Sequence, residues 1–109
     1  MSVLLALALV GSGLHGTVLR GPTTPVCRVG TPCSAPAAGV TLRFVRRHRV
    51  AARARVHKDG GYAVRLAPGI YTVLFTPHLL IGTGIRPRRV RVLAGPPREL
   101  DFWIDTGIR

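Results

Sequence analysis

Short stretches of alternating apolar and polar residues run along most of the chain, and glycine and proline interrupt them at intervals of roughly ten residues. Successive residues of a strand point to opposite faces of a sheet, so this alternation predicts half-buried β-strands. The predicted strands span residues 14–20, 40–45, 49–57, 62–66, 70–76, 88–93 and 99–105. Short strands separated by turn residues are typical of an all-β sandwich.

The alternation also assigns one face of each strand to the core and the other to solvent. The predicted inward side chains are aliphatic or aromatic, as in Leu42 and Phe44 or in Tyr71 and Val73. The predicted outward side chains include Arg43, Arg53, Arg55, Arg65, Arg89 and Arg91. Arginine between apolar positions also discourages edge-to-edge association of sheets.

The turn at Lys58-Asp59-Gly60 predicts a hairpin that places Arg53 opposite Arg65. Like charges directly across a ladder are destabilising, so this pair requires solvent, a carboxylate or a bound anion between the two side chains. Solvation is the simpler explanation, and a bound anion is the functional one. The candidate anion-binding set is Arg53, Arg55, Arg65, Arg89 and Arg91.

Two further turns predict pairing. Pro68-Gly69 has the residues of a type II turn and predicts that Leu66 lies opposite Tyr71. The Gly95-Pro96-Pro97 connection predicts an ion pair of Arg91 with Asp101 and a cation–π contact of Arg89 with Trp103. The functional alternative for Trp103 is a stacking platform for a sugar or a base.

Composition limits the architecture to one small domain. The chain has 109 residues, of which 47% are hydrophobic, enough for a core but not for two lobes with a cleft between them. Ser2, Ser12 and Ser34 show no nucleophile–base pattern, and Asp101 and Asp105 are too far apart along one predicted strand for paired carboxylate chemistry. We expect no enzyme, no cofactor and no metal.

The charge is strongly basic, because Lys and Arg total 16 against 4 acidic residues, for a net charge of +12. Such a domain is attracted to nucleic acid, anionic lipid head groups and acidic polymers in a salt-dependent way. The sequence has no recognition helix and no basic-plus-aromatic pattern, so we expect no sequence-specific nucleic-acid binding. Codon usage in a GC-rich genome is a neutral explanation for the preference for arginine over lysine.

Residues 3–10, VLLALALV, are followed by Gly11, Ser12 and Gly13. The run is too short to span a bilayer, and it has the length of a secretory signal core with small residues after it. We expect a signal remnant over residues 1–13 and a domain over residues 14–109, secreted or in the bacterial cell envelope. A positive segment before the run is missing, so either the true start lies further upstream or the run is the first strand of a cytosolic protein.

Cys27 and Cys33 lie in CRVGTPC, where Gly30 and Pro32 supply a turn. A local disulfide fits this spacing in an exported protein. Free thiols remain an alternative, as does redox or metal chemistry. Five residues between the cysteines, and four histidines without ligand spacing (His15, His48, His57 and His78), make the chemical roles weaker.

Three segments together resemble the small exported carboxypeptidase regulatory-like domains of bacteria: GTVLRGPTTPVCRVGTPCSAPAAGVTLRF, KDGGYAVRLAPGIYTV and LDFWIDTGIR. The resemblance implies a seven-stranded Greek-key sandwich similar to transthyretin. It also implies an accessory module that stabilises, spaces or binds. A related branch of that fold hydrolyses 5-hydroxyisourate with a carboxy-terminal Tyr-Arg-Gly-Ser, but this chain ends Thr-Gly-Ile-Arg, so no catalytic residue is carried over.

Two hypotheses of different class follow. The first is an exported, non-catalytic module with a structural or binding role in the cell envelope, whose partner is an envelope protein. The second is a polyanion-binding protein that uses an arginine-rich sheet face, whose partner is an acidic polymer.

Overall fold

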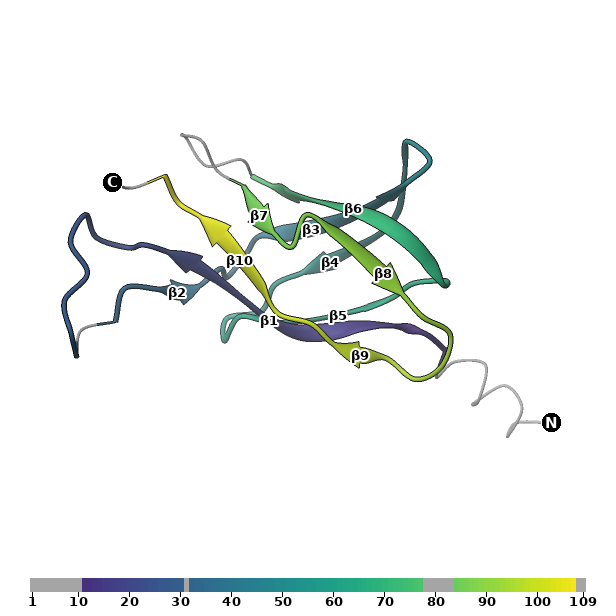
Figure 1. Ribbon diagram of the computed structural model, residues 1–109, viewed down its shortest axis with the longest axis horizontal. Coiled ribbons are helices and arrows are strands. Elements are labelled where there is room, and N and C mark those ends of the chain that lie inside the picture. Colours follow the sequence, from purple (N-terminus) through teal and green to yellow (C-terminus); the bar gives the residue numbers. More distant parts are fainter. Residues whose placement is uncertain (1–10, 31, 78–83, 108–109) are drawn as a thin grey trace.

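A computed structural model describes residues 11–30, 32–77 and 84–107, which form two β-sheets that pack face to face (Figure 1). The described residues contain strands but no helix, so this part of the chain holds no apolar helix of membrane-spanning length. Residues 1–10 of the expected signal remnant (residues 1–13) lie outside the described residues, as does His78. Residues 11–13 are described, and Gly13 is already the first residue of a strand, one residue before the expected start of the domain.

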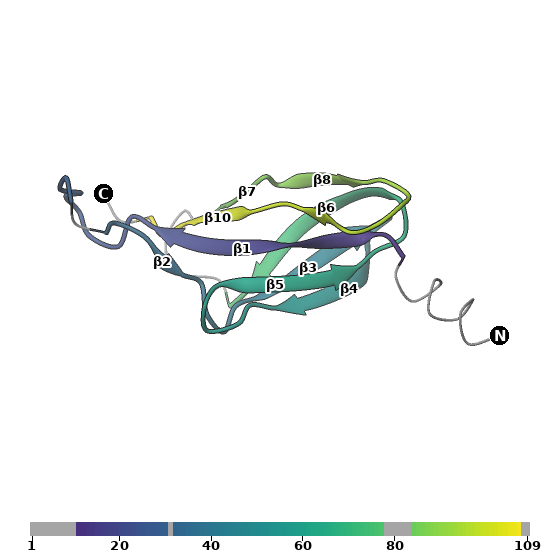
Figure 2. The same ribbon diagram turned by 90° about the horizontal axis from the view of Figure 1, so that it is seen from below.

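The first sheet is organised around one long strand, β1 (Gly13–Gly21). The first half of β1 pairs with β5 (Gly61–Arg65) and β9 (Arg98–Glu99). Its second half pairs with β2 (Ala35–Pro36) and with β10 (Phe102–Asp105), and β10 also pairs with β7 (Ile85–Arg86). Figure 2 shows β1 running along the molecule between β5 on one side and β10 on the other.

The second sheet has four antiparallel strands in the order β4-β3-β6-β8. These strands are β3 (Thr41–Arg46), β4 (Arg49–Arg55), β6 (Gly69–Thr76) and β8 (Arg89–Val92). A two-residue loop joins β3 to β4, and both of its residues, Arg47 and His48, have positive φ angles of 53° and 63°. Two consecutive residues of this kind make the type I′ geometry that suits the twist of a tight hairpin.

The hydrophobic core lies between the two sheets, as the alternation predicts. Phe102 of β10 contacts Tyr62 of β5 and Phe44 of β3, with ring centroids 5.4 and 6.3 Å apart. Leu42 and Val73, from adjacent strands of the four-stranded sheet, are fully buried. All-β architecture with one core between two sheets is therefore confirmed.

The seven predicted strands all exist, with shifts of one or two residues at most ends. The last one differs, because the segment predicted as one strand over residues 99–105 is divided at Leu100 and Asp101 into β9 and β10. The two short strands β2 and β7 were not predicted. Each spans two residues, which is too short for alternation to be detected.

All three predicted pairings are wrong, because at each of these turns the chain crosses from one sheet to the other. At the first turn, Val18 of β1 donates its N–H to the Gly60 carbonyl oxygen (2.7 Å). As a result β5 pairs with β1 and not, as predicted, with β4. At the second, Leu66 and Ser12 exchange hydrogen bonds, so β5 stays beside β1 while β6 joins β3. The third turn joins β8 of one sheet to β9 of the other.

Candidate anion-binding site

The outer face of the four-stranded sheet carries most of the candidate residues. Facing residues in an antiparallel ladder share a side, so the registers determine which side chains lie together on this face. We call this surface the arginine face. Its outward residues are Thr41, Arg43, Val45, Val50, Arg53, Arg55, Ile70, Thr72, Leu74, Thr76, Arg89 and Arg91.

At one corner of the arginine face, Arg43 and Arg53 lie directly opposite each other on β3 and β4. Arg55 is two residues further along β4 and faces Thr41. The predicted like-charged pair was Arg53 with Arg65. It is wrong because Arg65 belongs to β5 in the other sheet, where it pairs with Gly13. The like-charged pair therefore exists, with Arg43 in the place of Arg65.

Arg43 is the most constrained of these side chains. It is half-buried, and its Nε atom is buried without a hydrogen-bond partner among the described residues. A buried donor without an acceptor costs roughly 1–3 kcal/mol relative to a paired one, and more when the group is charged. Arg53, directly across the ladder, adds a like charge. A bound anion would relieve the electrostatic part of both costs.

At the opposite corner, Arg89 faces Thr72 and Arg91 faces Ile70, both on β6. The predicted ion pair of Arg91 with Asp101 and the predicted contact of Arg89 with Trp103 are both wrong, because β8 and β10 lie in different sheets. Both arginines are exposed. Arg89 and Arg91 therefore keep their charges available on the same face as Arg43.

Trp103 lies in the other sheet, opposite Leu19 of β1 and Arg86 of β7. It is half-buried, and its indole packs so closely on Gly21 that a Cβ there would come within 2.5 Å of the ring. This packing explains the tryptophan as a structural residue, so its position does not favour the stacking platform.

The four acidic residues of the chain, all of them described, lie outside the arginine face and its sheet. Three of them accept hydrogen bonds from backbone amides: Asp101 from Thr17 (2.9 Å), Asp59 from Gly61 (2.8 Å) and Asp105 from Gly107 (2.9 Å). Glu99 is in β9, exposed. The arginine face consequently has positive charge and no carboxylate of its own.

Asp101 lies at the interruption between β9 and β10, where its side chain helps to hold the fold together. Asp101 takes the Thr17 N–H, and the Tyr62 hydroxyl donates to the Leu100 carbonyl oxygen at 2.5 Å. Burial, together with the charge of Asp101, raises the pKa of Tyr62 above its ordinary range. Tyr62 therefore stays protonated and acts as a hydrogen-bond donor, not as a base.

Arg46 lies at the end of the arginine-bearing hairpin but on its inner side. Its guanidinium is 5.9 Å from the centre of the Tyr71 ring and donates to the Pro68 carbonyl oxygen at 3.3 Å. The Tyr71 hydroxyl donates to Ala67, also in the crossing between β5 and β6. Arg46 thus stabilises a chain crossing and is not part of the candidate site.

A shallow hollow of about 720 Å³ lies on the other sheet, over β1 and β5. Glycine and alanine form part of its lining, and the charged or titratable residues at it are His15, His57, Lys58, Asp59, Tyr62 and Glu99. Within the described residues, no group of three or more histidine, cysteine or acidic side chains could hold a metal ion. Its mixture of opposite charges makes it a weaker anion site than the arginine face.

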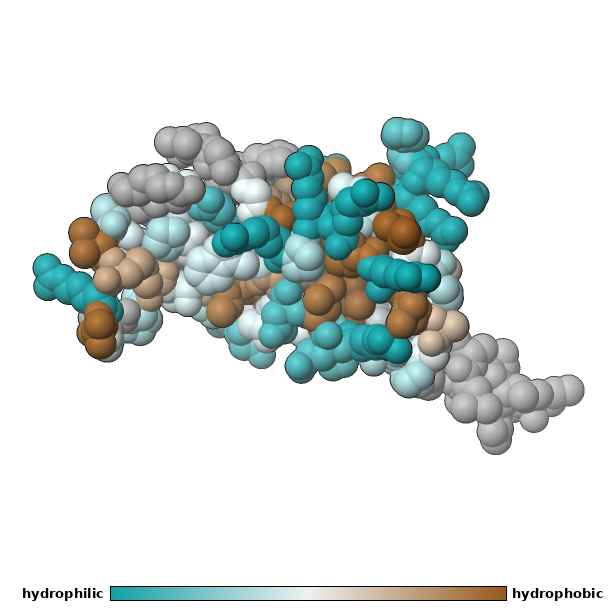
Figure 3. Space-filling view, in the orientation of Figure 1, coloured by the Kyte–Doolittle hydropathy of each residue, from teal (hydrophilic) through white to brown (hydrophobic). Residues whose placement is uncertain are grey.

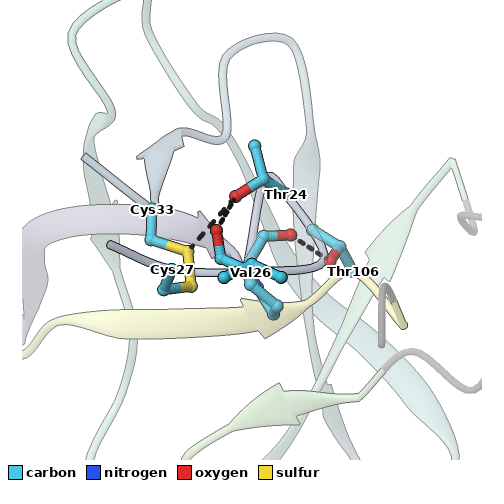
Figure 4. The surroundings of a disulfide bond; sticks show 6 residues. Thr24, Val26, Cys27, Cys33 and Thr106 are labelled. Carbon is cyan, nitrogen blue, oxygen red and sulfur yellow. Dashed lines mark hydrogen bonds between the residues drawn. A yellow bond between two sulfur atoms is a disulfide. The ribbon is translucent and has the colours of Figure 1, made fainter. Parts of the chain in front are cut away.

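Cys27 and Cys33 form a disulfide, with Cα atoms 5.5 Å apart, in the loop between β1 and β2. This loop extends away from the two sheets (Figures 1 and 2). Figure 4 shows the contacts around the bond: the Thr24 hydroxyl donates to the Val26 carbonyl oxygen (2.8 Å), and Thr106 donates to Pro22 (2.6 Å). The disulfide fixes the shape of the loop rather than the core.

Four of the five predicted anion-binding residues therefore share one face, namely Arg53, Arg55, Arg89 and Arg91, and Arg65 does not. Arg43 was predicted to point outward but was not counted in the site. The signal that could have added it is the short Arg47-His48 connection, which pairs β3 with β4.

Chemically, the face can bind oxyanions, because guanidinium groups donate charge-assisted hydrogen bonds to carboxylate, phosphate or sulfate. Comparisons of the chain with protein-family models, with curated proteins and with solved structures find no match.

Proposed function

We propose that this protein is an exported, non-catalytic β-sandwich module that binds an acidic partner through its arginine face. One observation carries the proposal: Arg43, Arg53, Arg55, Arg89 and Arg91 share one sheet face, and all four carboxylates of the chain are elsewhere. A surface with a single sign of charge attracts polyanions over long range and holds them by short-range hydrogen bonds.

The hydrogen bonding of the two charge types supports the same proposal. Three of the four side-chain carboxylates accept hydrogen bonds from backbone amides. The Nε atom of Arg43, in contrast, is buried without an acceptor among the described residues. Charged groups engaged in folding are poor candidates for ligand binding. A guanidinium that has no carboxylate of the fold beside it can take its anionic partner from a ligand.

Export is supported by the disulfide, because such bonds persist in oxidising compartments and are rare in the cytosol. The measurement is the intact mass, with and without reductant, of protein recovered from fractionated cells of the native host. We expect an oxidised species outside the cytoplasm, lacking about the first 11 residues, because Ser12 is hydrogen-bonded to Leu66 and Gly13 begins β1. A full-length, reduced species in the cytosol would contradict export.

The finer fold assignment, a Greek-key sandwich of the carboxypeptidase regulatory-like type, belongs to the same proposal. It is supported by the three segments quoted above and by the way consecutive strands β4, β5 and β6 alternate between the sheets. In that assignment the module is an accessory domain that binds or spaces, which agrees with an arginine face that offers contact but no nucleophile.

Binding to poly-L-glutamate at low salt tests the proposed function directly. The double variant Arg43→Gln/Arg53→Gln removes two charges from the arginine face, and Arg65→Gln/Arg98→Gln removes two from the other sheet. We expect the first variant to lose about tenfold in affinity, because each exposed ion pair contributes up to about 1 kcal/mol. The second should lose less than about twofold. Equal losses would mean that binding follows net charge alone and would overturn the proposed site.

A further inference from the structure

Aliphatic side chains lie among the arginines on the arginine face. Val45 and Val50 face each other on β3 and β4, and Ile70 and Leu74 are on β6. We call these four residues the aliphatic band. Ile70 is 54% exposed and Val50 36% exposed, and the other two are half-buried.

The registers place Leu74 and Ile70 on β6, the strand between the two arginine corners, with Thr72 between them, and place Val45 and Val50 next to the Arg43–Arg53 pair on β3 and β4. Leu74 faces Arg43 across one ladder, and Ile70 faces Arg91 across another. Strands β3 and β8 flank β6, so the two corners are separated by roughly 10 Å across the sheet. Figure 3 shows hydrophilic and hydrophobic side chains side by side over β8.

The outer face of the other sheet differs. Among the described residues, the large hydrophobic side chains that are exposed are Ile70, Val50 and Leu93 on or next to the four-stranded sheet, and Val26 and Val29 in the disulfide loop. The face over β1 and β5 has none of them. Exposed aliphatic groups and the arginines of the arginine face therefore lie on one surface.

This combination distinguishes between classes of acidic partner. A fully hydrated polymer neutralises the arginines but gains nothing from the aliphatic band. A protein partner would cover the band, but it would need carboxylates fixed at positions that match arginines on three different strands, whereas lipid head groups can diffuse to them. At a bilayer surface, arginines stay among hydrated phosphates while aliphatic side chains reach the acyl boundary.

We propose that the acidic partner is an anionic lipid bilayer and that the arginine face lies flat on it, with the aliphatic band against the acyl boundary. This proposal rests on the proposed function, because it names the partner of the same face. Each arginine near an anionic membrane surface strengthens binding by about fivefold. Five such residues, supported by the band, give a reversible peripheral attachment.

The test compares binding to vesicles of equal parts phosphatidylglycerol and phosphatidylcholine with binding to poly-L-glutamate. The variant Ile70→Thr/Leu74→Thr keeps the net charge and the strand preference but removes aliphatic surface. We expect it to lose about tenfold in vesicle affinity, since each residue contributes several-fold, and to bind poly-L-glutamate as the unchanged protein does. Equal vesicle affinity of variant and parent would overturn the proposal.

The disulfide loop supplies the matched control. Val26 and Val29 are 68% and 106% exposed, so Val26→Thr/Val29→Thr removes comparable aliphatic surface from another place. We expect this variant to keep its vesicle affinity. If it loses affinity while the Ile70→Thr/Leu74→Thr variant does not, the loop is the contacting element and the proposal is wrong.

A fluorescence reporter covers the case in which the threonine variant fails to fold. Ile70→Trp places an indole in the band, and quenching by lipids with brominated acyl chains reports contact with the acyl region. We expect quenching of this variant and little in the parent, whose single tryptophan is half-buried in the other sheet. Absence of quenching in both would overturn the proposal.

The two proposals fail in distinguishable ways. Binding to poly-L-glutamate that depends on Arg43 and Arg53, without any vesicle binding, would overturn the lipid partner and leave the proposed function intact. Absence of binding to both probes would overturn both.

Discussion

The two sheets of this sandwich use their polar residues differently. In the sheet around β1, Asp101, Asp59 and the Tyr62 hydroxyl are bound to backbone groups at turns and interruptions. In the four-stranded sheet, Arg43 and Arg53 face each other with no carboxylate beside them. A polar group that completes the hydrogen bonding of the fold stabilises it, whereas an exposed charged group that the fold does not use can contact a partner.

The net charge of +12 describes the whole chain, but its distribution decides what each face can do. Substitutions in the sheet around β1 should change stability and leave binding intact. Substitutions on the arginine face should weaken binding without lowering stability.

The largest effect is expected at Gly16 of β1. A Cβ there would press on the Leu100 carbonyl oxygen and lie 2.7 Å from Asp101 Oδ1, at the interruption between β9 and β10. Gly16→Ala should lower the free energy of unfolding by about 2–3 kcal/mol, because the backbone must shift. Urea unfolding measures this. Gly84→Ala is the control, since a Cβ at Gly84 meets nothing within 4 Å, and equal losses in the two variants would contradict the account.

The second effect is the loss of the carboxylate of Asp101. Asp101→Ala removes the acceptor of the Thr17 N–H and should destabilise the fold by about 1–2 kcal/mol. Asp101→Asn keeps a carbonyl oxygen that can accept the same bond, so it should cost less. Both should bind poly-L-glutamate at least as tightly as the parent, and weaker binding would break the separation between the sheets.

A gain in stability is the third expectation. Arg43→Met keeps the aliphatic stem, removes the unpartnered Nε and relieves the repulsion by Arg53. It should raise the free energy of unfolding by about 1 kcal/mol and weaken poly-L-glutamate binding at the same time. Arg65→Met, an exposed substitution in the other sheet, should change neither quantity measurably. Destabilisation by Arg43→Met would show that this side chain serves the fold.

The smallest effect at neutral pH concerns Tyr62, whose pKa is raised by burial and by Asp101. The unfolded chain then releases this proton first, at about pH 10, so the stabilising contribution is complete below that pH and is lost as the pH rises further. The urea midpoint should fall above about pH 10 and fall less in Tyr62→Phe. A midpoint with the same pH dependence in both proteins would argue against the Tyr62 contribution.

Sequence reasoning predicted the strands and their faces because alternation is a local property. Phe44, Tyr71 and Phe102 are inward as expected, and Arg43 and Arg53 are outward. Alternation shows which residues of a strand point outward, but it does not show which residues of the adjacent strands lie beside them.

The pairing of strands depends on contacts between distant residues, so turn chemistry could not supply it. The hydrogen bond from Val18 to Gly60 places β5 on β1, and no feature of the Lys58-Asp59-Gly60 turn indicates it. Arg65 was therefore assigned to the wrong face. The candidate site could be predicted as a residue type and a side of the sheet, but the Arg43–Arg53 pair at one corner of it required the register.

The most direct test of the arginine face is a nuclear magnetic resonance titration of the isotope-labelled protein with poly-L-glutamate. The account predicts shifts in the backbone amides of β3, β4, β6 and β8 and in the side-chain Nε–H signal of Arg43, with little change in β1 and β5. Shifts that centre on the hollow lined by His15 and Glu99, or that spread evenly over both sheets, would contradict it.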